Sequence, residues 1–291
     1  MPGQLWVSVL EMGSLYGLIA LAFYLTKEGT GLFIFAVGPF AMFSGLTVAF
    51  FGANQGWPLP VLVLLGIVFT TLIAVLTEVL VVRPLEARSR PHDEFPALIG
   101  AVALLFVVEQ FAGWVYGRRQ YPGVRWVTIE PIRIGDAVVV GQSVVLLAVT
   151  LLCFTTVWAW QRHGRYGRML RAVGDEPDAA ALMALPVKRI RISAYVAAGI
   201  VCGLAGPLIA PKAGMSFTRG LEYTIFGFLA FVLAGRGFVF APLLGGYLTA
   251  LILTASAYVL GSAWLDYMTL FAVVAILLVR PEGLLTRRVR A

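Results

Sequence analysis

Residues 59–82 read LPVLVLLGIVFTTLIAVLTEVLVV, and their single charged side chain, that of Glu78, lies near the end. As a helix, such a run is long enough to cross the hydrocarbon of a bilayer, which takes about 20 apolar residues. It shows no alternation of apolar and polar residues, which argues against a membrane β-barrel. Because the bilayer interior offers backbone groups no hydrogen-bonding partner, this stretch predicts a transmembrane helix.

Comparable runs recur along the whole chain. Of its 291 residues, 60% are hydrophobic and 13% are charged, and the mean hydropathy is +0.89. Soluble domains hold about 45–50% apolar and about 25% charged residues, so a water-soluble fold is excluded. The candidate spans are 5–25, 31–51, 59–82, 95–116, 143–160, 192–210, 223–235, 238–260 and 264–279. Because the seventh is short, we expect an all-α polytopic membrane protein with eight to nine transmembrane helices in one domain, 1–291.

The basic residues orient these spans. Sixteen of the 22 Lys and Arg residues fall in one set of alternate connections, which includes 161–191 and the C-terminal end. The other set, which includes 117–142, holds six. Since cytoplasmic loops carry the excess of basic residues, we expect 161–191 to be cytoplasmic and 117–142 to be periplasmic. The net charge of +7 therefore reflects membrane orientation and does not indicate nucleic-acid binding.

The connection 161–191 reads QRHGRYGRMLRAVGDEPDAAALMALPVKRIR. Its first part, with Tyr166, Met169, Leu170 and Val173 at helical spacing, predicts a short amphipathic helix that Gly174 can end. A second short helix is predicted over about 178–185, with Asp175 as a plausible N-cap.

An apolar cluster lies in that second part, at Leu182, Met183 and Leu185. Exposed apolar side chains in a loop usually mark a contact with a partner. The alternative is a basic loop that only sets orientation, which explains the arginines but leaves the apolar cluster unexplained. On the residues alone, both interpretations stay open.

Six short sequence motifs lie along the chain in a recognisable order. They are Gly13-Ser14-Leu15-Tyr16-Gly17-Leu18-Ile19-Ala20-Leu21, Glu78 with Arg83-Pro84-Leu85, Gly167-Arg168-Met169-Leu170-Arg171-Ala172 followed by Pro186-Val187-Lys188-Arg189, Gly220-Leu221, Leu233-Ala234-Gly235-Arg236-Gly237 with Gly245-Gly246, and Arg280-Pro281-Glu282-Gly283-Leu284-Leu285. In this order they resemble the membrane subunits of branched-chain amino acid ABC permeases of the Liv type, a family that includes urea-type permeases. The resemblance covers nearly the whole chain.

The resemblance implies an importer permease of the bacterial inner membrane that works with separate partners. These would be a homologous or identical membrane subunit, two ATP-binding subunits that hold ATP and Mg, and a periplasmic substrate-binding protein. The chain itself would need no cofactor or metal and would have no catalytic residues. The loop 161–191 would dock into the ATP-binding subunits through Gly167, Arg168, Arg171, Gly174, Asp175, Glu176, Asp178, Leu182, Met183 and Leu185. The chain has no G-x-x-x-x-G-K-[ST] phosphate loop, which agrees with a non-ATPase subunit.

The second span departs from the family. A polar Asn-Phe-Ala-His-Gly-Glu type motif is expected there, whereas this chain has Ile34, Val37 and Pro39 at its polar positions. Glu222 stands where the family often has lysine. We therefore expect a cargo that is larger, more apolar or aromatic than an ordinary branched-chain amino acid. The candidate pathway residues are Ile34, Val37, Pro39, Ser44, Thr47, Glu109 and Glu222, although hydroxyls in spans more often bond to their own helix.

Two other functions remain as alternatives. A stand-alone secondary transporter or channel would need no ATP-binding partner. An intramembrane enzyme would need a nucleophile–base pair or a metal site, but the only histidines, His92 and His163, lie in cytoplasmic loops. Cys153 and Cys202 lie in apolar runs, where thiols are usually packing residues.

Overall fold

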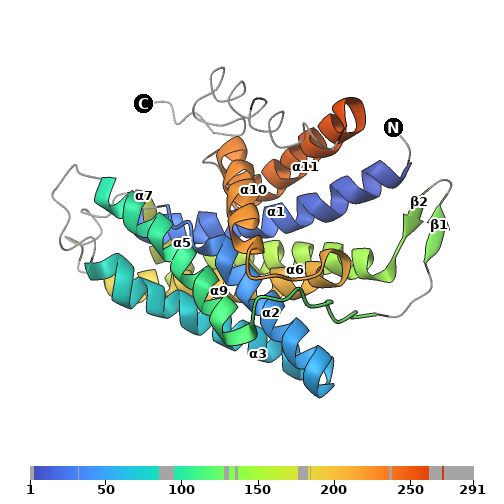
Figure 1. Cartoon of the computed structure of the whole chain (residues 1–291). Helices are drawn as coiled ribbons and strands as arrows, with labels where there is room; N and C mark the ends of the chain where they lie inside the picture. Colours follow the sequence, from blue (N-terminus) through green and yellow to red (C-terminus); the bar gives the residue numbers. More distant parts are fainter. Residues whose placement is uncertain are drawn as a thin grey trace. The chain divides into compact units, whose positions relative to one another are not determined.

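The computed structural model describes residues 3–31, 33–84, 95–127, 131–134, 137–175, 183, 185–235, 238–261 and 271. Its helices are α1 (Gly3–Thr30), α2 (Val37–Gln55), α3 (Leu59–Thr77) with a π-helical continuation η1 (Glu78–Val82), α5 (Phe95–Tyr116), α6 (Gly141–His163), α7 (Arg165–Asp175), α9 (Val187–Ala213), α10 (Arg219–Ala234) and α11 (Ala241–Leu260) (Figure 1). The strands β1 (Ile132–Ile134) and β2 (Ala137–Val139) pair antiparallel.

The helices confirm the all-α, multi-pass architecture. Within the described residues, seven helices are long and apolar enough to cross a membrane: α1, α2, α3 with η1, α5, α6, α9 and α11. The predicted short span corresponds to α10, which has 16 residues. The predicted span 264–279 lies outside the described residues, apart from residue 271.

The chain divides into two compact units, and the first consists of 1–21, 125–154 and 226–291. Here α1 and α11 meet through glycines: a Cβ added to Gly246 would overlap the backbone of Gly13 and Gly17. A Cβ added to Gly245 would likewise overlap the backbone oxygen of Ala230 in α10. Small residues that let backbones approach are the usual basis of helix packing in membranes, and Gly13 and Gly17 serve that role here.

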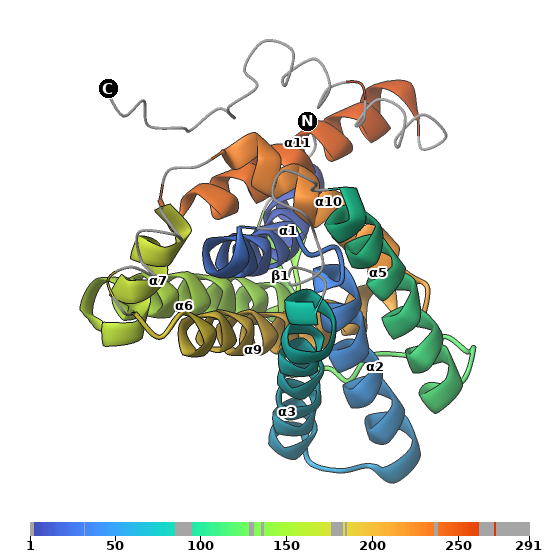
Figure 2. The same cartoon turned by 90° about the vertical axis from the view of Figure 1, so that its left-hand side faces the viewer.

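The second unit, 22–124 and 155–225, is built around α2, α3 and α9, which pack against one another (Figures 1 and 2). A Cβ added to Gly199 would lie 2.7 Å from Cα of Thr71, and one added to Gly203 would lie 2.8 Å from Cα of Ile67. At Gly206 it would overlap the backbone oxygen of Ala41 in α2. Gly199, Gly203 and Gly206 of α9 therefore serve close packing on α3 and α2.

The short hairpin β1–β2 was not predicted. Ile132 pairs with Val139 and Ile134 with Ala137, and the amide of Val138 donates a 2.9 Å hydrogen bond to Oε1 of Gln4. Branched apolar residues on both sides of a Gly-Asp pair are a hairpin signal. In a chain this apolar, they are easily read as one more hydrophobic stretch.

Candidate coupling and translocation sites

The corner between α6 and α7 depends on two glycines. A Cβ added to Gly164 or to Gly167 would overlap the backbone oxygen of Trp160, and at Gly167 it would also lie 2.6 Å from Cα of Gln161. Backbone atoms cannot swing aside as a flexible side chain can. The chain can make this tight turn because both positions lack a side chain. This explains why the predicted coupling motif has glycine at position 167.

Polar contacts hold α7 against the end of α6. Arg168 Nη1 donates a 2.9 Å hydrogen bond to the backbone oxygen of His163, and Arg171 Nε donates one of 3.2 Å to Oε1 of Gln161. Gln161 is fully buried, and its Oε1 also accepts a 3.3 Å bond from the hydroxyl of Tyr24 in α1. Gln161 is thus the point where α1, α6 and α7 are joined, a role that sequence reasoning missed.

The apolar face of α7 packs inward. Leu170 and Val173 are buried, as the helical spacing predicted, whereas Tyr166 is exposed. A Cβ added to Gly29 of α1 would lie 2.8 Å from Cβ of Ala194 in α9 and 3.7 Å from Cδ1 of Leu170. The end of α1, the α7 segment (165–175) and the start of α9 therefore meet at Gly29.

The other residues of the predicted coupling loop are described only in part. The backbone of Gly174 and Asp175 closes α7, which agrees with a helix end near Gly174. Met183 is 65% exposed and Leu185 is half-buried. Glu176, Asp178 and Leu182 lie outside the described residues, as does the rest of the second predicted helix apart from Met183 and Leu185.

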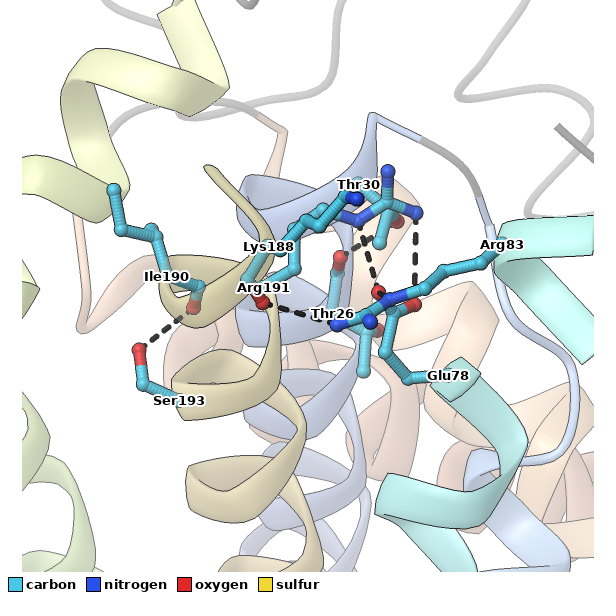
Figure 3. Close-up of polar contacts among 8 residues, drawn as sticks. All are labelled: Thr26, Thr30, Glu78, Arg83, Lys188, Ile190, Arg191 and Ser193. Carbon is cyan, nitrogen blue, oxygen red and sulfur yellow. Dashed lines mark hydrogen bonds and ion pairs between the residues drawn. The ribbon is translucent and has the colours of Figure 1, made fainter. Parts of the chain in front are cut away.

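A carboxylate joins α3 to α9 beside this segment (Figure 3). Glu78 Oε1 lies 3.0 Å from Nε of Arg83 and 3.1 Å from Nε of Arg191, and its side chain is inaccessible to solvent. Arg83 Nη2 also donates a 3.1 Å hydrogen bond to the backbone oxygen of Lys188. Glu78 and Arg83 belong to one sequence motif and lie five residues apart. The second partner, Arg191, lies 113 residues away in sequence and gave no local signal.

Six of the seven candidate pathway residues are buried within the chain. Ile34, Val37, Pro39, Ser44, Thr47 and Glu109 are inaccessible or nearly so, and only Glu222 keeps an accessible side chain, at 40%. Thr47 donates a 2.8 Å hydrogen bond to the oxygen of Phe43 in its own helix, the common role of such hydroxyls.

Prolines explain two of these placements. Pro39 has no N–H to donate to the oxygen of Phe35, and that oxygen accepts a 2.9 Å bond from Oγ1 of Thr224 in α10 instead. The helix α2 begins at Val37, not at residue 31 as predicted, and Pro39 lies in its first turn, where the N–H that proline lacks would have no partner within the helix. Pro207 likewise cannot donate to the oxygen of Gly203, which accepts a 2.6 Å bond from Oγ of Ser44. The helix α9 continues through Pro207, because neighbouring hydroxyls can satisfy carbonyls that a proline frees.

Two carboxylates lie near the start of α10. Oε1 of Glu109, in α5, accepts a 2.7 Å hydrogen bond from the amide of Leu221, and so satisfies one of the free N–H groups at this helix end. Glu222 pairs at 2.6 Å with Nη1 of Arg219, one turn earlier. The carboxylate of Glu109 is favourable here because a helix N-terminus carries partial positive charge.

Comparisons with known proteins agree with this helical arrangement. A family model described as the permease component of the branched-chain amino acid transport system matches residues 5–279. The high-affinity branched-chain amino acid transport system permease protein LivH of Escherichia coli (strain K12) is 25% identical over 294 residues, which cover 95% of this chain and 92% of LivH. The fructose import permease protein FrcC of Rhizobium meliloti is 36% identical over 123 residues, 40% of this chain and 33% of FrcC. The solved structure of PsaBC from Streptococcus pneumoniae in complex with Fab shares the fold, with a TM-score of 0.50 at 12% identity, and the match covers 94% of this chain and 89% of that one.

Proposed function

Because this chain belongs to the family of permease components of branched-chain amino acid transport systems, we propose that it is the pore-forming subunit of an ATP-driven importer in a bacterial inner membrane. The observation that carries the proposal is the family match over residues 5–279, which includes the connection 161–191. The cargo is a small organic solute: an amino acid, an amide, or a more apolar or aromatic compound.

The proposed assembly contains this chain, a homologous or identical membrane subunit, two ATP-binding subunits and a periplasmic substrate-binding protein. ATP and Mg bind to the ATP-binding subunits, and this chain hydrolyses nothing. The solute enters from the periplasm and crosses between the two membrane subunits. Glu222 is the candidate pathway residue best suited to such a shared surface, because its side chain is accessible in the isolated chain.

Force from the ATP-binding subunits enters through the connection 161–191. The packing of the α7 segment supports this part of the proposal, because its corner with α6 and its buried face against α9 leave little freedom for independent movement. When ATP draws the partner subunits together, α7 transmits the displacement to the end of α6 and the start of α9. Those helices continue into the membrane, so the displacement opens or closes the pathway.

Reconstitution tests direction, energy source and cargo class. The complete complex in liposomes should accumulate labelled phenylalanine only when the binding protein and ATP are on opposite sides of the membrane. We expect unlabelled leucine or valine to compete weakly, because Ile34, Val37 and Pro39, although buried in the isolated chain, replace polar residues of the family and make the second span more apolar. Tight competition by leucine or valine alone would argue against the apolar cargo class. Uptake by this chain without ATP-binding subunits would refute the importer.

The Gly167→Ala variant tests the coupling role of the α7 segment. The added methyl group meets the backbone of α6 and must push α7 away, at a cost of about 1–3 kcal/mol for such overpacking. We expect ATP hydrolysis to persist and uptake per ATP to fall. Gly113→Ala is the matched control, because there the methyl group meets only the Phe217 ring, with its nearest atom at 3.1 Å. Equal uptake per ATP in both variants would refute the docking role.

A further inference from the structure

Glu78 occupies an unusual position for a carboxylate in a membrane helix. Its side chain is inaccessible, yet it lies between two arginines, one from its own chain segment and one from α9 (Figure 3). Charged groups inside a membrane segment are costly and persist where a partner or a function retains them.

The cluster joins the last turn of α3 to the first turns of α9. Glu78 opens the π-helical stretch η1, and π-helical turns occur frequently at functional positions. Arg83 follows directly and reaches across to the backbone oxygen of Lys188, in the first turn of α9. From α9, Arg191 contacts both carboxylate oxygens of Glu78: Nε lies 3.1 Å from Oε1, and Nη2 lies 3.5 Å from Oε2. The two helix ends are therefore tied by three polar contacts in both directions.

Further along the same helices, α3 and α9 touch backbone to backbone at Gly199 and Gly203. The ionic contacts fix the two helices at one end and the glycines fix them further along. A pair held at several points along its length moves as one body, because close-packed interfaces transmit displacement and do not deform gradually.

We propose that Glu78 is a positioning residue for energy coupling: it clamps α3 to α9 so that a displacement of the α7 segment reaches α3 as well as α9. The α7 segment packs on the start of α9, close to Arg191, so movement of α7 carries Arg191 with it. Without the clamp, α9 would slide against the end of α3, and part of the displacement would be lost. This inference rests on the proposed function, because it presumes that force enters at the α7 segment.

The test uses the complete reconstituted complex and measures labelled phenylalanine transported per ATP hydrolysed. We expect Glu78→Gln and Arg191→Gln to lower this ratio roughly tenfold, at the upper part of the range for mutations that change coupling. Arg191→Lys keeps the positive charge but removes the guanidinium group that contacts both carboxylate oxygens of Glu78. We expect it to lower the ratio less. The exchange Glu78→Arg with Arg191→Glu should restore only part of the ratio, because opposite charges still face each other across the two helices while Arg83 then meets a like charge at position 78. Arg119→Gln, which removes an exposed arginine after α5, is the charge-matched control.

The ratio separates coupling from mere stability. If Glu78 only stabilises the fold, the variants will yield less complex, but each assembled complex will keep the unaltered ratio, and the clamp is refuted. Should Glu78→Gln fail to assemble, Arg191→Lys and the charge exchange decide in the same way. An unaltered complex that transports nothing with ATP would refute the proposed function and the clamp together. That outcome is distinct from normal transport with an unchanged ratio in the variants, which refutes the clamp alone.

Discussion

Replacing Ser44 with alanine should destabilise the protein through a carbonyl in another helix. The hydroxyl of Ser44 donates a 2.6 Å hydrogen bond to the oxygen of Gly203, whose ordinary helical donor is missing because residue 207 is proline. Gly66 of α3 packs directly on this hydroxyl, and an added Cβ there would lie 2.6 Å from Oγ. Ser44→Ala therefore leaves the oxygen of Gly203 without this donor, at a place with little room for a water molecule.

The size of the effect follows from burial. A buried polar group that loses its partner costs about 1–3 kcal/mol. Hydrogen bonds between membrane helices average about 0.6 kcal/mol, with a maximum of about 1.7 kcal/mol. We expect roughly 1–2 kcal/mol for Ser44→Ala, because the acceptor is fully buried and freed by a proline. For chains of this size that corresponds to a fall in Tm of roughly 2–8 °C.

A double-mutant cycle isolates the cause. Pro207→Ala restores an N–H that can donate to the oxygen of Gly203, so Ser44→Ala should cost little in that background. The measurement is Tm in nanodiscs at one scan rate for both single variants, the double variant and the parent. Thr150→Val is the control, because its hydroxyl bonds to the oxygen of Leu146 in its own helix, which keeps its helical donor. Additive effects of Ser44→Ala and Pro207→Ala would refute the reasoning.

Further changes test other contacts. Gly206→Ala should lower Tm more than Gly113→Ala in the same nanodisc measurement, because its methyl group meets the backbone of α2 and not a side chain; equal Tm values would contradict backbone contact. Glu109→Gln should keep uptake near normal while Glu109→Ala lowers it, since the amide oxygen still accepts from Leu221; a loss with both variants in liposome uptake would mean that the charge itself is needed. Replacing Gly174 or Asp178 should uncouple ATP hydrolysis from uptake without loss of expression, and normal coupled uptake would oppose the docking role of the loop.

Composition and periodicity were enough to predict the spans. The apolar runs at 59–82, 143–160 and 192–210 all lie within helices. In a bilayer the backbone N–H and C=O groups must hydrogen-bond within their own segment, which a helix allows. Helical spacing at Leu170 and Val173 predicted their burial for the same local reason. The ends of the helices were predicted less accurately. Both α6 and α9 extend beyond the predicted spans into polar residues, where hydropathy does not indicate a helix.

Contacts between distant segments could not be predicted in this way. Arg191 lies in a basic run whose other members gave the same orientation signal, so nothing singled it out as a partner of Glu78. The pairing of Ser44 with Gly203 depends on how α2 lies against α9, and a single sequence does not record that placement. Pro207 could have pointed to a freed carbonyl, but not to the hydroxyl that satisfies it.

These contacts change how polar residues in the spans are interpreted. Without water, helices in a bilayer gain no hydrophobic energy by associating, so close packing and hydrogen bonds between helices specify the arrangement. Ser44, Thr47 and Thr224 all donate to backbone oxygens within the chain, and two of those oxygens were freed by prolines. Polarity within a span therefore indicates a structural contact at least as readily as a pathway. An accessible polar side chain is the better criterion for a pathway, and among the seven candidates Glu222 alone meets it.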